Sequence, residues 1–504
     1  MAQNYTSLNV LFSTNTSAKY IPPVPLSMKQ VVCGPQWETQ KVLGHYVSIK
    51  TPTVYDIAAV AAGLPQTQTP DLVVVRTDAH MANVPTNLAG IRCPKVLLYA
   101  DTYHCHEPIQ SAFRYLNSEK YDFIIILYDK QHVHWFREAG HENVYFMPGL
   151  EVEHVPVDFS EDRQKSIVFV GQFGKYHLRR KWRLDQMSLR GYPLRVEMMT
   201  RRESARVYAQ SQISFNCSLN GDLNMRVFEV LSAGGFLLTD KLSRQAGLDQ
   251  VFEDGRHMVC YRDQNDLFAK LDYYLAHPDE ALAIARQGHA ECLRRHLPEH
   301  RVDSLLRLIF EGERPVYNDF SDDPRACLPP TSARTELRER TAIYEFFQEV
   351  HLHQESVYVL CCGATHLACD LADLYGLELA ILQIEEFSDS EREALARAGV
   401  QHQVQIFSDN QARSRLWDAL LLDADRLGPS FDRLLSGYQY RWLVLSRADA
   451  DRLATLTQAL AAKGWRLLKP GLPLFERLQR TSPVRTAPTP AVSNQVPSTP
   501  WKWS

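Results

Sequence analysis

The stretch that most constrains the fold of this chain covers residues 220–240, with the sequence NGDLNMRVFEVLSAGGFLLTD. A polar loop leads into a short segment whose apolar residues recur at helical spacing. Asp222 is the expected N-cap of this helix, and Gly234 and Gly235 are its expected end. The apolar run that follows, Phe236–Thr239, is typical of a buried strand in a parallel sheet. The stretch therefore predicts a helix followed by a strand, the repeating unit of an α/β fold.

The predicted helix carries a polar stripe, because Asp222, Arg226 and Glu229 are spaced three or four residues apart. A helix N-terminus has unpaired N–H groups and a partial positive charge, to which Arg226 adds a full charge, so an anion is expected to bind there. Glu229 offers two acceptor oxygens that suit the vicinal hydroxyls of a ribose or another sugar. The alternative is that Arg226 and Glu229 form an exposed ion pair worth at most about 0.5 kcal/mol.

The rest of the chain alternates continuous apolar runs with helical or irregular segments, which favours parallel α/β sheets. The predicted strands of the first part cover residues 28–34, 71–75, 95–101, 122–127 and 143–147. Ligands bind beyond the carboxyl ends of the strands in such sheets. Asp101 and His104, which follow one of these strands, are therefore candidates for deprotonating an acceptor hydroxyl. The alternative is that Asp101 caps a turn and His104 is an ordinary loop residue.

A second glycine-bearing turn follows the predicted strand 166–170, and a basic segment follows the turn. Gly171 and Gly174 could admit a ligand to the backbone N–H groups, and Lys175 and Arg179 could add positive charge. This arrangement is typical of a phosphate site, and we expect it to share one pyrophosphate with Arg226. The alternative is that the basic segment is a solvated face.

Residues 220–235 resemble the nucleotide-sugar-binding signature of GT-B glycosyltransferases, and in detail they are similar to the CgeB-like, spore-maturation-type branch. The resemblance lies in the Asn-rich loop, the Arg-x-Phe-Glu run and the small-x-Gly run, and it extends more weakly over residues 71–296. It implies two Rossmann-like domains facing each other across a cleft, with Glu229 binding the donor ribose and Arg226 the pyrophosphate. The expected donor-site residues are Asn220, Asp222, Asn224, Arg226, Glu229, Gly234 and Gly235, joined by Gly171, Lys175 and Arg179.

One position departs from this signature. Many retaining members of the superfamily have a second glutamate eight residues before Glu229, where this chain has Gly221 followed by Asp222. Either Asp222 substitutes in part or the sugar is held differently, so the anomeric outcome of transfer stays open.

A proline-rich segment at residues 313–335 precedes a third series of apolar runs, which resembles a class I methyltransferase fold. Its cofactor loop would be Cys361-Cys362-Gly363-Ala364, which has only one of the usual three glycines. We therefore expect this domain to serve scaffolding or acceptor binding. The expected organisation is an N-terminal Rossmann-like, acceptor-side domain at 1–156, a nucleotide-sugar-binding domain at 157–312, a linker at 313–340, a methyltransferase-like α/β domain at 341–480 and a disordered tail at 481–504.

Composition excludes several other classes of function. With 504 residues and a formal net charge of −4, the chain has no overall positive field that would recruit nucleic acid. No apolar run is long enough for a transmembrane helix and no signal peptide is recognisable, so a cytoplasmic protein is expected. The ten cysteines lack the spacings of a zinc site, and no metal or other cofactor is expected.

Together these features predict a metal-independent glycosyltransferase that moves a sugar from a nucleoside-diphosphate donor to a hydroxyl of a carbohydrate or protein acceptor. One alternative is a non-catalytic carbohydrate- or partner-binding scaffold derived from such an enzyme. Another is an active bifunctional glycosyl- and methyltransferase, which would bind S-adenosylmethionine.

Overall fold

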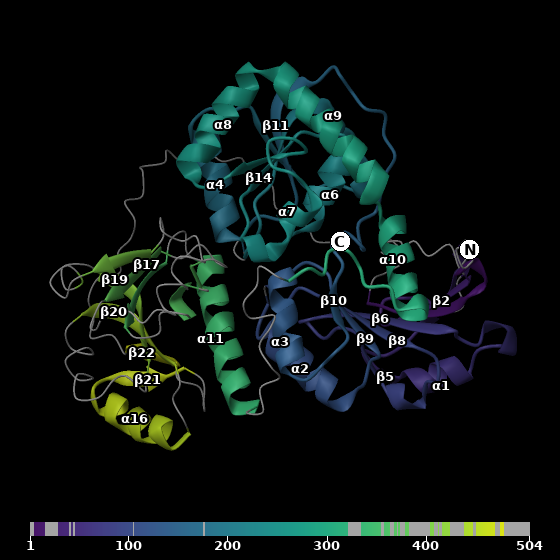
Figure 1. The fold of residues 1–504 in the computed structure, drawn as a ribbon, viewed down its shortest axis with the longest axis horizontal. Coiled ribbons are helices and arrows are strands. Elements are labelled where there is room, and N and C mark those ends of the chain that lie inside the picture. Colours follow the sequence, from purple (N-terminus) through teal and green to yellow (C-terminus); the bar gives the residue numbers. More distant parts are fainter. Residues whose placement is uncertain are drawn as a thin grey trace.

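The chain folds around three open α/β sheets that follow one another along the sequence (Figure 1). This computed structural model describes residues 5–15, 29–39, 42–43, 46–103, 105–174, 177–320, 334–353, 357–362, 367–369, 371–372, 378–382, 404–407, 412, 416–423, 438–446, 450–468 and 474–477. The sheets are parallel except at their edges, which confirms the predicted α/β class. No helix within these ranges has the length and apolar character needed to cross a membrane.

The first sheet has the strand order β10-β9-β8-β6-β1-β2-β4-β3, and all its pairs are parallel except β3 with β4. Its strands are β1 (Asn9–Ser13), β2 (Lys29–Gly34), β3 (Val42–Leu43), β4 (Tyr46–Lys50), β6 (Leu72–Asp78), β8 (Lys95–Ala100), β9 (Phe123–Ile126) and β10 (Val144–Phe146). The prediction that the sheet begins at residues 28–34 was wrong, because β1 precedes β2 and lies between β6 and β2. Only Val10, Leu11 and Phe12 form its apolar run, which is too short to stand out in a polar N-terminal segment.

Helices from two distant parts of the chain cover the first sheet. α1 (Ile57–Ala62), α2 (Pro108–Ser118) and α3 (Val133–Glu138) come from the crossovers between its strands. α10 (Pro298–Glu311) follows the second sheet in sequence but packs Val302 and Leu305 into the same core as Val10 and Phe12 of β1 (Figure 1). The chain therefore returns to its first domain after completing the second.

The second sheet has the strand order β12-β11-β13-β14-β15, and all its strands are parallel. The strands are β11 (Gln164–Val170), β12 (Leu194–Glu197), β13 (Ser211–Phe215), β14 (Leu237–Asp240) and β15 (Val259–Tyr261). The helices are α4 (Leu178–Leu189), α5 (Arg201–Gln210), α6 (Met225–Ser232), α7 (Leu248–Val251), α8 (Gln264–Ala276) and α9 (Pro278–Arg295). The connections run outward in opposite directions from β11 and β13, so a topological switch point lies between these two strands. Ligands of open parallel sheets bind at such points.

The third sheet has the strand order β18-β17-β16-β19-β20-β22-β21, in which β22 is antiparallel to both of its neighbours. Its strands are β16 (Tyr358–Cys362), β17 (Glu378–Leu382), β18 (Val404–Phe407), β19 (Leu416–Asp423), β20 (Gln439–Ser446), β21 (Trp465–Leu467) and β22 (Leu474–Arg477), with α16 (Ala450–Ala462) before β21. These strands lie in the third series of apolar runs, which follows the proline-rich segment. Residues 363–366, which include part of the expected cofactor loop, lie outside the described residues, as does the expected tail from 481 onward.

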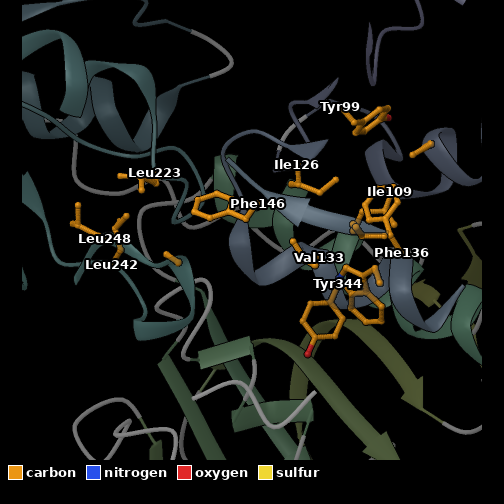
Figure 2. Packing of buried hydrophobic residues seen from close by; sticks show 14 of the residues in the cluster. Tyr99, Ile109, Ile126, Val133, Phe136, Phe146, Leu223, Leu242, Leu248 and Tyr344 are labelled. Atoms are coloured by element: carbon orange, nitrogen blue, oxygen red, sulfur yellow. The ribbon is translucent and has the colours of Figure 1, made fainter. Parts of the chain in front are cut away.

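A long helix, α11 (Arg334–His353), precedes the third sheet and begins inside the segment expected to be a linker. It lies between the third sheet and helices α2 and α3 of the first domain (Figure 1). Tyr344 of α11 packs near Val133 and Phe136 of α3 in one hydrophobic cluster (Figure 2). The Tyr344 ring meets the Trp135 ring edge to face, with centroids 4.9 Å apart. α11 therefore joins the third sheet to the first domain by direct packing.

Packing between α6 and α9 requires a glycine, which gives a test of the second domain. A Cβ on Gly288 would lie 2.1 Å from the carbonyl oxygen of His257 and 2.9 Å from Leu231 of α6. We expect Gly288→Ala to destabilise the chain by about 2 kcal/mol, because backbone must move to relieve the clash. The matched control is Gly63→Ala, since Gly63 has φ −78° and its nearest atoms would be 3.5 Å away. Equal thermal unfolding temperatures for the two variants would contradict this packing.

Candidate functional site

The helix expected to bind an anion is α6, and it begins at Met225 with Asn224 as its N-cap. The prediction that Asp222 is the N-cap was wrong, because Oδ1 of Asp222 accepts a hydrogen bond of 2.7 Å from the backbone N–H of Leu219. That bond closes the loop before the helix and delays the first helical turn. At the other end, Gly234 has φ +77°, a left-handed conformation that favours glycine, so the predicted end of the helix is confirmed.

Arg226, in the first turn of α6, reaches across the switch point of the second sheet. Its Nε donates a hydrogen bond of 2.8 Å to the carbonyl oxygen of Val170, where β11 ends. Its Nη1 donates one of 2.6 Å to Oδ1 of Asn216, the residue after β13. The guanidinium lies over the Phe169 ring, with Cζ 4.3 Å from the ring centroid. The cation is therefore fixed where a ligand of this kind of sheet would bind.

Gly171 makes this position of Arg226 possible. A Cβ at Gly171, whose φ is +144°, would lie 2.2 Å from Nη2 of Arg226. The N–H of Gly171 donates to the carbonyl oxygen of Glu197, so this particular N–H is engaged inside the protein. Gly171 therefore leaves space for the guanidinium of Arg226, in addition to any ligand that the turn admits.

Two further arginines lie behind this turn on α4. Arg180 and Arg183 are 6% and 8% exposed. Arg180 donates to the carbonyl oxygens of Cys217, at 2.8 Å from Nη2, and Gln172, at 2.9 Å from Nη1. Arg183 donates to the Sγ of Cys217 and the hydroxyl of Tyr261. All of these partners are formally neutral acceptors.

Because these arginines bond to neutral partners, positive charge is concentrated at the switch point of the second sheet. Within the described residues, no carboxylate forms an ion pair with Arg180, Arg183 or Arg226. Burial lowers the pKa of Arg180, and the nearby charge of Arg226 lowers it further. Arg179 is half-buried on α4, and burial and the charge of Arg183 likewise lower its pKa. The pKa of Arg183 is instead raised, because Tyr261, Cys217 and Asp240 outweigh the effect of its burial. An anion would relieve the repulsion between Arg180 and Arg226.

Asn224 adds an unsatisfied amide at the start of α6. Its side chain makes no capping hydrogen bond. Both Oδ1 and Nδ2 are buried and have no hydrogen-bond partner among the described residues. A buried polar group in this state costs roughly 1–3 kcal/mol, so a ligand or water that bonded to it would be stabilising.

Glu229 lies one turn further along α6 and lines a small pocket. The other lining residues are Glu153, Val155, Arg201, Ser204, Ala205, Tyr208 and Ser232. Burial raises the pKa of Glu229, although the charges of Arg201 and Arg226 oppose this shift. Arg201 also pairs with Glu153 of the segment between the first two sheets, at 3.5 Å. Glu229 and Arg226 form no ion pair, so the simpler alternative raised by their spacing is wrong.

The loop before α6 contacts the first domain. The Nδ2 of Asn220, which is fully buried, donates a hydrogen bond of 2.6 Å to the carbonyl oxygen of Tyr103. The backbone N–H of Leu223 donates one of 3.0 Å to the carbonyl oxygen of Tyr128. Asp101 follows β8, two residues before Tyr103, and adopts φ +59°. The structure thus brings the loop of Asp101 and the loop of Asn220 together across the domain boundary.

A buried carboxyl group lies at the same boundary. Asp129 accepts a hydrogen bond of 2.5 Å from the hydroxyl of Thr102. Burial raises the pKa of Asp129 well above its ordinary value, and the charges of Asp222 and Asp101 add to the shift. The charges of Asp101 and Asp222 therefore both raise the pKa of one buried carboxyl group between the two domains.

The remaining residues predicted for the site either close α6 or lie outside the described residues. The N–H groups of Gly234 and Gly235 donate to the carbonyl oxygens of Leu231 and Val230, so both glycines close α6. His104 and Lys175 lie outside the described residues. In the described part of the chain no group of three His, Cys, Asp or Glu side chains could hold a metal ion.

Sequence reasoning missed Arg180, Arg183, Asn216 and Arg201. Arg180 and Arg183 are three residues apart in the basic run and so share a helical face, but selecting that face requires the position of the helix on the sheet. Asn216 and Arg201 carry no local signal, because they meet Arg226 and Glu229 only in the folded domain.

Comparison with known proteins bears on this part of the chain. The model of a family described as glycosyl transferase-like matches residues 169–307. This range begins in β11 and contains the arginines of α4 and all of α6. A search of the curated proteins finds no significant match.

Several solved structures are similar to the chain at low sequence identity. One is HepE from Anabaena in complex with UDP and glucose, with 11% identity and a TM-score of 0.42, over 60% of this chain and 100% of that one. Another is a sucrose-phosphate synthase from Thermosynechococcus elongatus, with 11% identity and a TM-score of 0.41, over 60% and 99%. TarM matches with 10% identity and a TM-score of 0.37, over 49% of this chain and 55% of TarM, so the chain spans about half the length of TarM. Residues 169–307, which include the arginines of α4 and the helix α6, are therefore similar to this glycosyl transferase-like family.

Proposed function

We propose that the chain is a GT-B glycosyltransferase that moves a sugar from a nucleoside-diphosphate donor to an acceptor hydroxyl, without a metal ion. The observation that carries the proposal is the group of arginines at the switch point of the second sheet, where Arg180, Arg183 and Arg226 bond to neutral partners only. The glycosyl transferase-like family match over the same residues supports it.

Arg226 would bind the diphosphate of the donor. Its guanidinium lies at the N-terminus of α6, where the helix adds partial positive charge. When the bond to the sugar breaks, negative charge develops on the departing diphosphate, and fixed cations stabilise this charge without having to reorient. The buried amide of Asn224 would supply a further hydrogen bond from the same helix end. Arg180 would stabilise the diphosphate through its charge and not through hydrogen bonds, because its N–H groups donate to backbone carbonyl oxygens.

Glu229 would bind the ribose of the donor. The closed part of its pocket has a volume of about 10 Å³, which is room for about one water molecule. The ribose would therefore bind at the opening of the pocket, with its hydroxyls toward the carboxylate. The base and the diphosphate would then extend away from the pocket, the diphosphate toward Arg226 in the preceding turn.

The acceptor side is assigned to the first domain. Asp101 stands next to the contact between the two domains and is the described candidate for accepting the proton of an acceptor hydroxyl, if the reaction inverts the sugar. His104 is the second candidate from the same loop. The acceptor would be a carbohydrate or a protein.

Two finer assignments belong to this proposal. We place the chain in the CgeB-like branch on the residues of the α6 segment, and we assign the third domain a methyltransferase-like fold. The parallel third sheet, with one antiparallel strand between β20 and β21, supports the latter. A non-catalytic scaffold is the second candidate function, and Gly221, which stands where many retaining members have a glutamate, favours it.

Removal of the central cation tests the diphosphate site. We expect Arg226→Ala to weaken the binding of nucleoside diphosphates by roughly 10- to 100-fold, because a charged hydrogen-bond donor contributes about 1.5–3 kcal/mol. The measurement is isothermal titration calorimetry with a panel of nucleoside diphosphates. Arg202→Ala is the matched control, because Arg202 is an exposed arginine of the same domain. Equal affinities in the wild type and in both variants would contradict the site.

The pH dependence of binding tests Glu229. Because the pKa of Glu229 is raised above its ordinary value of 4.5, its carboxylate takes up a proton at a higher pH than an exposed glutamate does. A protonated carboxyl group accepts fewer hydrogen bonds from a diol. Nucleoside diphosphate affinity should therefore fall in the wild type as the pH is lowered from about 8 toward this raised pKa.

The control for this prediction is Glu229→Gln, which has no titrating group at this position. It should bind more weakly than the wild type at about pH 8 and should lose less affinity on acidification. Titration of the ligand phosphate affects both proteins equally and cancels in the comparison. Identical pH profiles for the two proteins would rule out a carboxylate contact with the ligand.

A further inference from the structure

The loop between β8 and α2 is held in an unusual backbone conformation. Asp101, Cys105 and Glu107 have φ values of +59°, +77° and +49°, in the left-handed region that residues other than glycine rarely adopt. Such conformations persist only where surrounding contacts impose them. α11, which belongs to the third domain in sequence, supplies some of these contacts.

α11 caps the helix that follows the loop. α2 has Glu107 as its N-cap and makes no side-chain capping hydrogen bond of its own. The Oε1 of Glu345 instead accepts hydrogen bonds from the backbone N–H groups of Ile109, at 2.8 Å, and Gln110, at 3.1 Å. A carboxylate at this place satisfies two exposed N–H groups of the helix and complements its dipole. Glu345 thus supplies from a distant segment the cap that the local sequence lacks.

α11 also joins the loop to the second domain. The Nε2 of Gln348 donates a hydrogen bond of 3.2 Å to the carbonyl oxygen of Thr102. The backbone carbonyl oxygen of Gln348 accepts one of 3.3 Å from Nδ2 of Asn220, which also bonds to the carbonyl oxygen of Tyr103. One turn of α11 therefore contacts the loop of the first domain and the loop before α6 at the same place.

The helix itself is firmly attached to the first domain. Arg340 forms an ion pair of 2.7 Å with Glu138 of α3, and Glu138 is buried. The Tyr344 and Trp135 rings pack edge to face, and Tyr344 lies against the α3 side of the cluster drawn in Figure 2. Movement of α11 would break these contacts together.

We propose that α11 is a positioning element of the transferase: Glu345 and Gln348 hold the β8–α2 loop, with Asp101 at its start, in register with the α6 loop that leads to the donor-binding residues. Glu345 and Gln348 are positioning residues and do not touch the substrate. The catalytic part of this inference rests on the proposed function, whereas the structural part does not. It gives the third domain a role in sugar transfer that needs no cofactor.

Hydrogen exchange measured on the full chain tests the structural part. We expect Glu345→Ala to increase amide exchange selectively in peptides covering residues 101–112, because two helix N–H groups lose their acceptor. Glu345→Gln keeps an acceptor oxygen and should restore much of the protection. Glu349→Ala is the matched control, since Glu349 is an exposed glutamate on the same helix. Unchanged exchange of residues 101–112 in Glu345→Ala and in Gln348→Ala would overturn the proposal.

Kinetics with an active sugar nucleotide tests the catalytic part. We expect Glu345→Ala and Gln348→Ala to lower kcat by about 10- to 100-fold, because a small misplacement of a reacting group has effects of this size. Nucleoside diphosphate affinity at Arg226 should stay within about twofold of the wild type, which separates misplacement from loss of the donor site.

Two results would overturn this part and can be told apart. If the wild type transfers sugar and the variants match its kcat although their loops exchange faster, α11 does not position the reaction. If the wild type neither binds nucleoside diphosphates nor transfers sugar, the proposed function itself fails, and the positioning role fails with it.

Discussion

The bridge that Arg226 makes between the ends of β11 and β13 is the interaction on which the candidate site depends. Arg226 donates hydrogen bonds to Val170 and Asn216, so the guanidinium is fixed by the sheet and its charge is not neutralised. Gly171 leaves the space for it, and the buried Arg180 and Arg183 add positive charge from α4. Concentrating like charges in this way is unfavourable in the absence of an anion, and burial without a carboxylate partner increases the cost. The arrangement is understandable as an anion site that is formed before its ligand arrives, and it places the site where an open parallel sheet binds ligands.

Contacts between the domains connect the candidate site to the rest of the molecule. The loop before α6 hydrogen-bonds to Tyr103 and Tyr128 of the first domain, and α10 returns from the second domain to the first core. α11 then meets both loops through Gln348. Residues far apart in sequence are therefore brought to one junction, with the arginines on one side and Asp101 on the other. The proposed sugar transfer would need this arrangement, because donor and acceptor must meet at a single bond.

The sequence predicted the fold class and the helix–strand unit around α6, because apolar periodicity and a terminal glycine pair are local signals. It also indicated Arg226 and Glu229, whose spacing is local. The sequence predicted Asp222 as the N-cap of α6, whereas the N-cap is Asn224. A side chain that can cap a helix can also close the preceding loop, and Asp222 does the latter by accepting a hydrogen bond from the N–H of Leu219. β1 was missed because its apolar run has three residues and is buried only by its neighbours in the sheet. The roles of Arg180, Asn216 and Glu345 depend on contacts between distant segments, which no local pattern reports. The start of α11 at Arg334, inside the expected linker, has a similar reason, because this helix is stabilised by packing on α2 and α3.

The most direct test of the central claim is a crystal structure of the full chain with a bound nucleoside diphosphate. The account predicts that phosphate oxygens lie within hydrogen-bonding distance of the Arg226 guanidinium, at the N-terminus of α6, with the ribose hydroxyls at the carboxylate of Glu229. A nucleotide bound with its phosphates away from Arg226 would contradict the account.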